Sequence, residues 1–278
     1  MRLQYLGTGA SEGFPALFCD CEACRKALES GGKNIKMRSC ALLDDKLLID
    51  LSPDLYAQKL RFNLSLSHVR SVVITHSHED HFDVFSLMLR GKDMASIINL
   101  NAGGVPVVEV YGNNKVQSMF NQAIATKLKG RGGRFDFHKV VPFMKFETDG
   151  FQFTPLPANH KEDEECLIYS IEKKGRRILY ANDTGALSPS TFEVLRGIVH
   201  DVVSMDCSRG ILPGDSHMGL QENVAMREML ISLGCVDENT RFILNHLSHM
   251  SGLAPYEFDE IARQHGFIIA FDGMIVDV

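Results

Sequence analysis

The 278-residue sequence has no segment that would carry the chain into a membrane or divide it into separate parts. No apolar run reaches the roughly 20 residues of a membrane-spanning helix, and the mixed N-terminal segment Met1–Gly7 is too short for a signal peptide. No stretch has the Pro-rich, Ser-rich or low-complexity composition of a linker, and no repeat recurs at solenoid periods. We therefore expect a single domain over residues 1–278, in a cytoplasmic protein that does not bind membranes.

The sequence also has no excess of positive charge. Its 29 lysines and arginines are outnumbered by 35 aspartates and glutamates, and the formal net charge of −6 argues against a stable nucleic-acid complex. The basic, glycine-rich segment Lys127–Arg134 is typical of an exposed loop, with contact to a phosphate as the alternative. A small anionic substrate stays compatible with this charge, because bound cations can reverse its sign locally.

The seven cysteines are an odd number in a sequence without an export signal, so we expect no disulfides. Three of them, Cys19, Cys21 and Cys24, fall within six residues and indicate a metal site. The other four are dispersed and are interpreted as small core residues: Cys40, Cys166, Cys207 and Cys235.

Short β-rich runs alternate with helical patterns along the chain. The runs expected to form strands are Leu3–Gly7, Ser39–Leu43, Lys46–Leu51, Val72–Thr75, Val105–Tyr111, Phe151–Leu156, Leu167–Glu172, Arg177–Ala181, Val202–Met205, Arg241–Leu244 and Phe267–Phe271. The patterns expected to form helices are Glu22–Glu29, Pro53–Leu60, Val84–Ile97, Lys115–Lys127, Pro189–Ile198, Gln221–Leu233 and Pro255–Gln264. Strands that come first in hairpins and then alternate with helices predict an α/β fold whose sheets are covered by helices.

One polar segment directly follows a predicted strand. Residues His76–His81 contain three imidazoles and two carboxylates. So many polar groups in one short segment are unfavourable in a hydrophobic core, whereas divalent cations could bind most of them at once. His76 and His78 alternate along extended chain and project to the same side. The adjacent Asp80 and His81 should diverge, which suits two cations better than one.

Further ligands are expected at the ends of other strands. His160, Asp183 and His246 each follow an apolar run that we interpret as a strand. A polar residue in such a place is ordinary when taken singly. Ligand sites in sheets flanked by helices, however, collect at one edge of the sheet. Three such residues together with the histidine-rich turn therefore indicate a common metal site.

The order His-x-His-x-Asp-His after a hydrophobic strand, then a distant His, an Asp and a last His, resembles the metallo-β-lactamase fold superfamily. This resemblance implies an αββα sandwich of two mixed sheets flanked by helices, with a dinuclear metal centre. It implies that His76, His78 and His160 bind one cation, that Asp80, His81 and His246 bind the other, and that Asp183 bridges them. True lactamases usually lack the bridging Asp, so the resemblance favours phosphodiesters or related esters over β-lactams as substrates. The fold alone does not decide this.

The cysteine loop at residues 19–24 needs a fourth ligand, because structural zinc sites are closed by four sulfur or imidazole ligands. We expect His249 to supply it, since no fourth cysteine is near and His246 is assigned elsewhere. The segment Gly7–Pro15 followed by Cys-x-Cys-x-x-Cys resembles the PhnP-type phosphodiesterases. That resemblance implies hydrolysis of cyclic ribose phosphates, two divalent ions (manganese or zinc) and a separate zinc held by three cysteines and a histidine. PqqB-like proteins share the cysteine loop.

The reaction expected from the resemblance is hydrolysis of a small phosphodiester, such as a cyclic ribose or nucleotide phosphate. A metal-bound hydroxide would attack the phosphorus, and His217, which resembles an additional active-site histidine of the family, would be the general acid. Asp50 follows a predicted strand and is expected to orient a ligand imidazole. The predicted catalytic residues are thus His217, Asp50 and Asp80, the last of which is also a cation ligand.

Two main alternatives stay open, and a thiolester or lactone hydrolase is a third that the cysteine loop disfavours. An RNA-processing nuclease of the same superfamily would need a basic surface, for which Lys127–Arg134 is the candidate. A non-catalytic, PqqB-like protein would bind metal or a metabolite on the same fold. The identity of the cations stays open because His and carboxylate ligands suit zinc, manganese and iron, and a homodimer is compatible with the sequence.

The remaining polar clusters receive ordinary interpretations. The acidic run Glu162–Glu165 is expected to be a solvated turn. Four histidines outside the motifs are expected to be surface or loop residues: His68, His138, His200 and His265.

Overall fold

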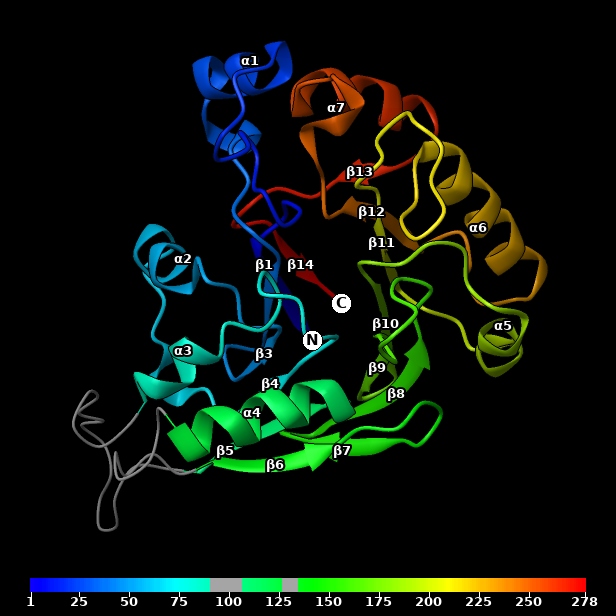
Figure 1. The fold of residues 1–278 in the computed structure, drawn as a ribbon. Coiled ribbons are helices and arrows are strands. Elements are labelled where there is room, and N and C mark those ends of the chain that lie inside the picture. Colours follow the sequence, from blue (N-terminus) through cyan, green and yellow to red (C-terminus); the bar gives the residue numbers. More distant parts are fainter. Residues whose placement is uncertain (91–106, 127–134) are drawn as a thin grey trace.

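The strands of the protein form two seven-stranded sheets within residues 1–90, 107–126 and 135–278, which are the residues that the computed structural model describes (Figure 1). The first sheet has the order β14 (Ile275–Asp277), β1 (Arg2–Gly7), β2 (Cys40–Leu43), β3 (Leu47–Ile49), β4 (Ser71–Val73), β5 (Val108–Gly112) and β6 (Phe135–Lys139). The second has the order β13 (Ile268–Ile269), β12 (Arg241–Asn245), β11 (Val202–Asp206), β10 (Arg176–Ala181), β9 (Leu167–Lys173), β8 (Phe151–Pro157) and β7 (Phe146–Thr148). Both sheets mix parallel and antiparallel pairs.

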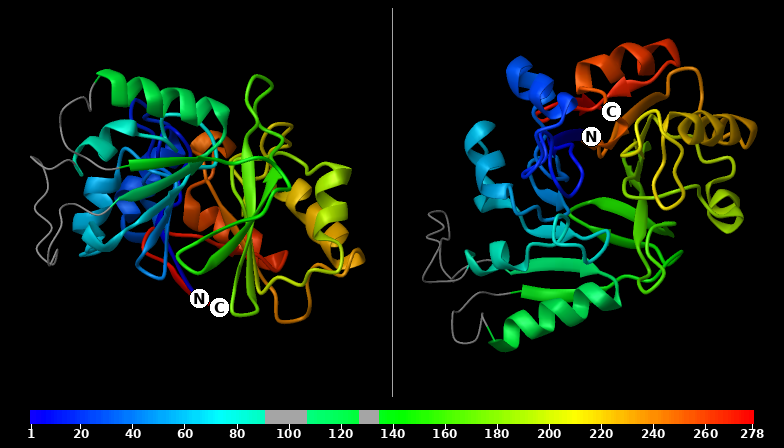
Figure 2. Two further views of the ribbon diagram at one scale, coloured as in Figure 1. Left: turned by 90° about the horizontal axis from the view of Figure 1, so that it is seen from below. Right: turned by 45° about the horizontal axis from the view of Figure 1, so that its top comes forward.

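Helices cover the outer face of each sheet, so the layers run helix, sheet, sheet, helix (Figures 1 and 2). The first sheet packs against α2 (Leu55–Arg61), α3 (Val84–Met88) and α4 (Asn114–Thr126). The second packs against α5 (Pro189–Leu195), α6 (Leu220–Ser232) and α7 (Pro255–Gln264). The predicted αββα sandwich is confirmed.

The cysteine-bearing N-terminal region lies beside α7. Helix α1 (Glu22–Ser30) contacts it through an ion pair of 2.6 Å between Lys26 Nζ and Glu257 Oε1. Three short 3₁₀ helices complete the described elements: η1 (Gly32–Asn34), η2 (Leu66–His68) and η3 (His249–Ser251). The two chain ends meet at the first sheet, where β1 pairs with β14 (Figure 2).

Central strands are buried on both faces, and this explains why they read as continuous apolar runs. In β10, Ile178 and Tyr180 enter the core between the sheets, whereas the intervening Leu179 packs beneath the outer helices. In β2, Leu43 enters the same central core and Leu42 faces the helices of the first sheet. The alternation follows from the two-residue period of a strand.

Three strands and one helix end differ from the sequence-based expectation. Strands β6, β7 and β14 were not predicted, because they are short or partly exposed edge strands with polar residues among the apolar ones. The helix expected over 84–97 is, within the described residues, the short α3. The segment Lys127–Arg134 and residues 91–97 of that expected helix lie outside the described residues.

His200 lies in a loop, as expected, between α5 and β11, but it is not a surface residue. His200 is fully buried, with Nε2 2.9 Å from Ser170 Oγ and Nδ1 3.2 Å from the carbonyl oxygen of Cys235. A histidine satisfied at both nitrogens can be a core residue, which a single sequence does not reveal. The four dispersed cysteines are buried and free, as expected. In the described part of the chain, no helix is both long and apolar enough to span a bilayer.

Candidate metal centre

The predicted dinuclear ligands all lie at one edge of the paired sheets. The segment His76–His81 follows β4, and Asp50 follows the parallel neighbour β3. In the second sheet, His160 follows β8, Asp183 follows β10 and His246 follows β12, and these three strands run in the same direction. Because like-directed strands bring their carboxyl ends to one edge, residues far apart in the chain converge there.

Three of these strand-end residues adopt left-handed backbone conformations. The φ angles are 65° for Asp50, 54° for Asp183 and 58° for His246. Such conformations cost about 1–3 kcal/mol each for residues other than glycine. They turn the chain immediately after the strand, and the three side chains lie among the converging ligands. Strain concentrated in this way is typical of functional sites.

A first group of four ligand atoms surrounds one point. His78 Nδ1 lies 2.9 Å from His76 Nε2 and 3.1 Å from His160 Nε2, and Asp183 Oδ2 lies 3.2 Å from His76 Nε2. In a tetrahedral site with metal–nitrogen bonds of about 2.0–2.1 Å, neighbouring nitrogens would be about 3.3 Å apart. A single imidazole nitrogen cannot bond strongly to two others at once, so the convergence fits a shared cation.

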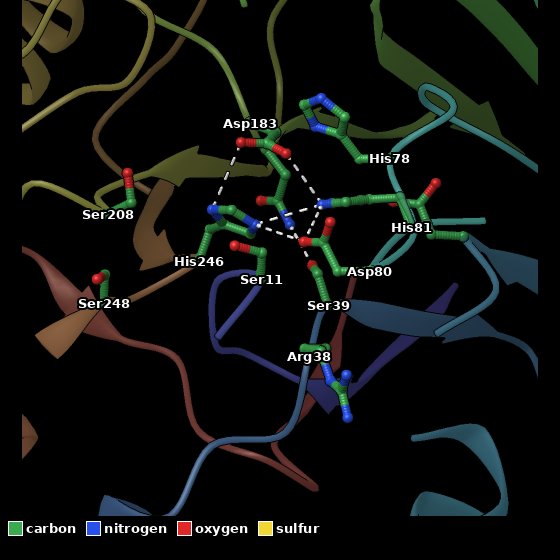
Figure 3. Close-up of polar contacts among 12 residues, drawn as sticks. Ser11, Arg38, Ser39, His78, Asp80, His81, Asp183, Ser208, His246 and Ser248 are labelled. Atoms are coloured by element: carbon green, nitrogen blue, oxygen red, sulfur yellow. Dashed lines mark hydrogen bonds and ion pairs between the residues drawn. The ribbon is translucent and has the colours of Figure 1, made fainter. Parts of the chain in front are cut away.

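A second group of four lies next to the first. Its atoms come from Asp80, His81, Asp183 and His246, and all lie within 4.8 Å of one another. His81 Nε2 lies 3.1 Å from Asp80 Oδ2, 3.0 Å from Asp183 Oδ2 and 3.3 Å from His246 Nε2. Figure 3 shows Asp183 between His81 and His246, with Asp80 facing the same point. The two groups share one oxygen, Asp183 Oδ2.

A buried carboxylate aims His81 at this second group. Asp50, fully buried, accepts hydrogen bonds from Thr75 N at 2.8 Å and from His81 Nδ1 at 2.7 Å. Because Nδ1 keeps its proton in that bond, Nε2 is the nitrogen through which His81 would bind a cation. Thr75 Oγ1 lies 3.0 Å from His76 Nδ1 and orients that imidazole in the same sense.

Burial and neighbouring charges shift the pKa values of the candidate ligands in opposite directions. Burial lowers the pKa of His246, but Asp183 and Asp206 outweigh it and raise the pKa to about 10. Burial raises the pKa of Asp80, but His81 and His246 hold it well below its usual range. His160 has fewer acidic neighbours, and its burial lowers the pKa to about 4. Burial also lowers the pKa of His81, but Asp80 and Asp50 outweigh it and raise the pKa well above its usual value. Protons on His81 and His246 therefore balance the carboxylates, and cation binding would displace one from each imidazole.

Asp206 is a site residue that was missed in the sequence. It ends β11, is fully buried, and places Oδ2 3.1 Å from His217 Nδ1 and 3.3 Å from His246 Nδ1. Its Oδ1 accepts hydrogen bonds from the backbone N–H groups of Ser208 and Met218. The available signal was a carboxylate at the end of the apolar run Val202–Met205, the same signal that pointed to Asp183.

The loop that carries His217 docks on the ligand-bearing strand ends. His217 Nδ1 lies 3.1 Å from Asp183 Oδ1, and its side chain is 27% exposed. A Cβ at Gly185 would lie 1.7 Å from the carbonyl oxygen of Asp215, so only glycine permits this close approach. His160 Nδ1 lies 3.5 Å from the carbonyl oxygen of Ser216. The loop therefore places His217 beside both cation groups.

The four predicted zinc ligands also come together. His249 Nδ1 lies 3.4 Å from Cys19 Sγ and 3.6 Å from Cys21 Sγ, and these atoms with Cys24 Sγ form a group within 4.8 Å. In tetrahedral zinc with bonds of about 2.3 Å to sulfur and 2.0–2.1 Å to nitrogen, this separation would be about 3.6 Å. Hydrogen bonding to His249 and the Cys24 backbone outweighs burial and lowers the pKa of Cys21 to about 6. A thiolate at neutral pH is the form that zinc binds.

The interpretation of Glu162–Glu165 as a solvated turn was wrong for one member. Glu164 is only 8% exposed, and its carboxylate accepts hydrogen bonds from the backbone N–H and the hydroxyl of Ser77. Glu162, Asp163 and Glu165 are exposed, as expected.

Comparison with known families agrees with this geometry. A family model described as the beta-lactamase superfamily domain matches residues 45–266. The match spans all seven predicted dinuclear ligands and His249, whereas the cysteine loop lies before it.

Individual relatives cover much of the chain. The chain is similar to coenzyme PQQ synthesis protein B of Acinetobacter baumannii (strain ACICU), with 24% identity over 100% of both proteins. It is similar to ribonuclease Z of a Picosynechococcus strain, with 28% identity over 63% of this chain and 48% of that protein. Among solved structures it is similar to a diphosphatase of the PhnP family, with 25% identity, a TM-score of 0.74, and coverage of 100% of this chain and 97% of the other.

Proposed function

The chain belongs to the beta-lactamase superfamily of metal-dependent hydrolases, and on that premise we propose that it hydrolyses small phosphodiesters, such as cyclic ribose or nucleotide phosphates. The observation that carries the proposal is the position of Asp183 Oδ2, which lies 3.2 Å from His76 Nε2 in one ligand group and 3.0 Å from His81 Nε2 in the other. An oxygen shared in this way fits a pair of cations. The similarity to a PhnP-family diphosphatase supports chemistry at phosphorus.

The donor set suits divalent cations. The first would be held by His76, His78 and His160, the second by Asp80, His81 and His246, with Asp183 common to both. Two bound divalent cations would lower the pKa of a water to about 7 and neutralise charge on the phosphoryl oxygens. Asp50 keeps the His81 lone pair on Nε2 and so maintains one ligand in the correct tautomer.

His217 is the proton donor in this proposal. Its Nδ1 lies 3.1 Å from both Asp206 Oδ2 and Asp183 Oδ1, so two buried carboxylates favour the imidazolium form. With Nδ1 engaged, Nε2 is the atom that can deliver a proton to the leaving oxygen. After the transfer, the neutral ring can keep its Nδ1 proton on Asp206, which preserves the orientation for the next cycle.

A second candidate rests on the full-length similarity to coenzyme PQQ synthesis protein B. In that case the chain would bind metal and a metabolite on the same fold without turnover. An RNA-processing nuclease is a third candidate, supported by the partial similarity to ribonuclease Z. Its required basic surface would have to come from Lys127–Arg134, which lies outside the described residues.

The experiment is elemental analysis of the purified protein, followed by turnover assays with zinc or manganese on a substrate panel. The panel contains 2′,3′-cyclic nucleotides, a linear phosphodiester, a dinucleoside diphosphate and structured RNA. We expect two ions beyond the structural zinc and fastest turnover of a small phosphodiester. Full metal loading without any turnover would favour the binding protein, and cleavage of RNA alone would favour the nuclease.

The His217→Ala variant tests the proton donor. General acid catalysis contributes about 10²–10⁴-fold, so kcat should fall by that factor while the metal content stays at the wild-type value. His265→Ala, a substitution of an exposed histidine after α7, is the matched control and should change neither quantity. Unchanged turnover in His217→Ala would remove this residue from the mechanism.

A further inference from the structure

Glu164 is a buried carboxylate that the proposed reaction does not use. It lies four residues after His160 and shortly before β9, with the exposed Asp163 and Glu165 on either side. Its hydrogen-bond donors are a backbone N–H, a hydroxyl and a side-chain amide, all of them uncharged. Burying a carboxylate is unfavourable unless its oxygens are well hydrogen-bonded. The buried carboxylate of Glu164 therefore calls for an explanation.

Glu164 accepts two hydrogen bonds from the turn that carries two ligands of the first cation group. Its Oε1 accepts from Ser77 N at 2.8 Å, and its Oε2 accepts from Ser77 Oγ at 2.6 Å. Ser77 lies between His76 and His78, whose ligand nitrogens are 2.9 Å apart. Two bonds to one residue hold both its peptide and its side chain, so rotation of the turn would break both.

The same carboxylate is anchored to a helix of the first sheet. Asn113 Nδ2 donates to Glu164 Oε1 at 2.8 Å and to the carbonyl oxygen of Glu165 at 2.9 Å. The amide is itself oriented, because its Oδ1 accepts from Lys115 N and Val116 N in the first turn of α4. Glu164 thus connects the end of β5, the histidine-rich turn and the segment that follows His160.

From these contacts we infer that Glu164 is a positioning residue for the first cation group. It holds the imidazoles of His76, His78 and His160 in the arrangement that would bind the first cation. The inference rests on the proposed dinuclear centre and extends it. Outer residues that orient metal ligands typically contribute about 10- to 100-fold to metal affinity. The second group is oriented by Asp50 and Asp206 instead. Replacing Glu164 should therefore lower the affinity for one cation and leave the affinity for the other unchanged.

The test is a cobalt titration of protein depleted of its dinuclear ions, followed by visible spectroscopy. His160→Ala identifies the binding step that belongs to the first group. In Glu164→Ala, that step should weaken by about 10- to 100-fold, the other step should stay at the wild-type value, and excess metal should restore kcat. Glu164→Gln should be milder, because its amide oxygen keeps two donors and Ser77 Oγ can accept from its NH₂ group. Glu165→Ala, an exposed neighbour with the same charge change, is the matched control.

The outcomes separate the two hypotheses. If wild-type protein takes up fewer than two ions at the His and Asp ligands, the proposed function fails. If wild-type protein binds both ions and Glu164→Ala binds them equally well, the positioning role is refuted. An equal loss of both binding steps, together with a lower melting temperature of the metal-free protein, would mean that Glu164 only stabilises the fold and would also overturn the inference.

Discussion

Replacing Asp50 by Asn should weaken the second cation site without disturbing the backbone. Asp50 has a φ of 65°, a conformation that Asn tolerates better than most residues, so the turn after β3 should persist. The substitution preserves shape but replaces one acceptor oxygen by an NH₂ group. Asp50 accepts a hydrogen bond from His81 Nδ1 at one oxygen and from Thr75 N at the other. Asn can serve only one of them with its oxygen.

The size of the expected loss in cation affinity follows from the hydrogen-bond donor that loses its acceptor in Asp50→Asn. If the amide turns its NH₂ toward His81, the imidazole must move its proton to Nε2 and loses the lone pair that would bind the cation. If it turns the other way, the buried Thr75 N–H is unsatisfied. An unpaired buried donor costs about 1–3 kcal/mol, which corresponds to about 5- to 150-fold in an equilibrium. We expect zinc affinity at one of the two dinuclear sites to fall by about 10- to 100-fold.

The assay is competition with a chelator for the two dinuclear ions, combined with kcat at increasing metal concentration. Asp45→Asn is the control, because Asp45 lies in the exposed turn before β3, at the opposite end of that strand. Asp50→Asn should recover turnover when metal is in excess, whereas Asp45→Asn should match wild type throughout. Wild-type affinity for both ions in Asp50→Asn would refute the orienting role. Lost turnover that excess metal does not restore would mean that Asp50 acts in some other way.

Three further outcomes are expected. Asp183→Asn should lower the affinity for both dinuclear ions, measured by elemental analysis after dialysis, whereas His160→Ala should lower it for one; loss of a single ion in both variants would rule out the bridge. Cys21→Ser should bind one zinc fewer and melt at a lower temperature; an unchanged zinc count would exclude the cysteine site. Burial lowers the pKa of Lys36 to about 8 from 10.5, so the unfolded chain binds more protons between these values. Stability relative to Lys36→Met should therefore rise by about 3 kcal/mol from pH 7 to above 10.5, measured by urea denaturation; a flat difference would show that burial does not lower the pKa of this amine.

The strongest sequence predictions concerned residues whose role is visible locally. The histidine-rich turn was recognisable because several ligand types occur within one short segment after a strand. His160, Asp183 and His246 were recognisable only as polar ends of apolar runs, and the resemblance to a known pattern grouped them. Asp206 ends a similar run, but the resemblance assigned it no ligand position, so nothing distinguished it from an ordinary strand end.

Glu164 and His200 show why burial escaped prediction. An acidic run of four residues has the composition of a solvated turn, yet one of its members meets Ser77 and Asn113, which come from other parts of the chain. His200 finds its partners on β9 and beyond α6. In each case the partner that makes burial tolerable is distant in sequence, and a window of neighbouring residues does not contain it.

By itself, the sequence determined which strands are apolar on both faces, which of them end in a candidate ligand, and which cysteines are close enough in the chain to bind one metal ion together. These properties depend on the spacing of neighbouring residues, which the chain carries in any conformation. The tertiary structure decided which atoms meet. Asp183 Oδ2 reaches both ligand groups only because β10 and β4 direct their carboxyl ends to the same edge of two packed sheets. The left-handed backbone conformation of Asp183 then turns its side chain toward both groups. Strand pairing and sheet packing determine that convergence, and both are contacts between residues far apart in the chain.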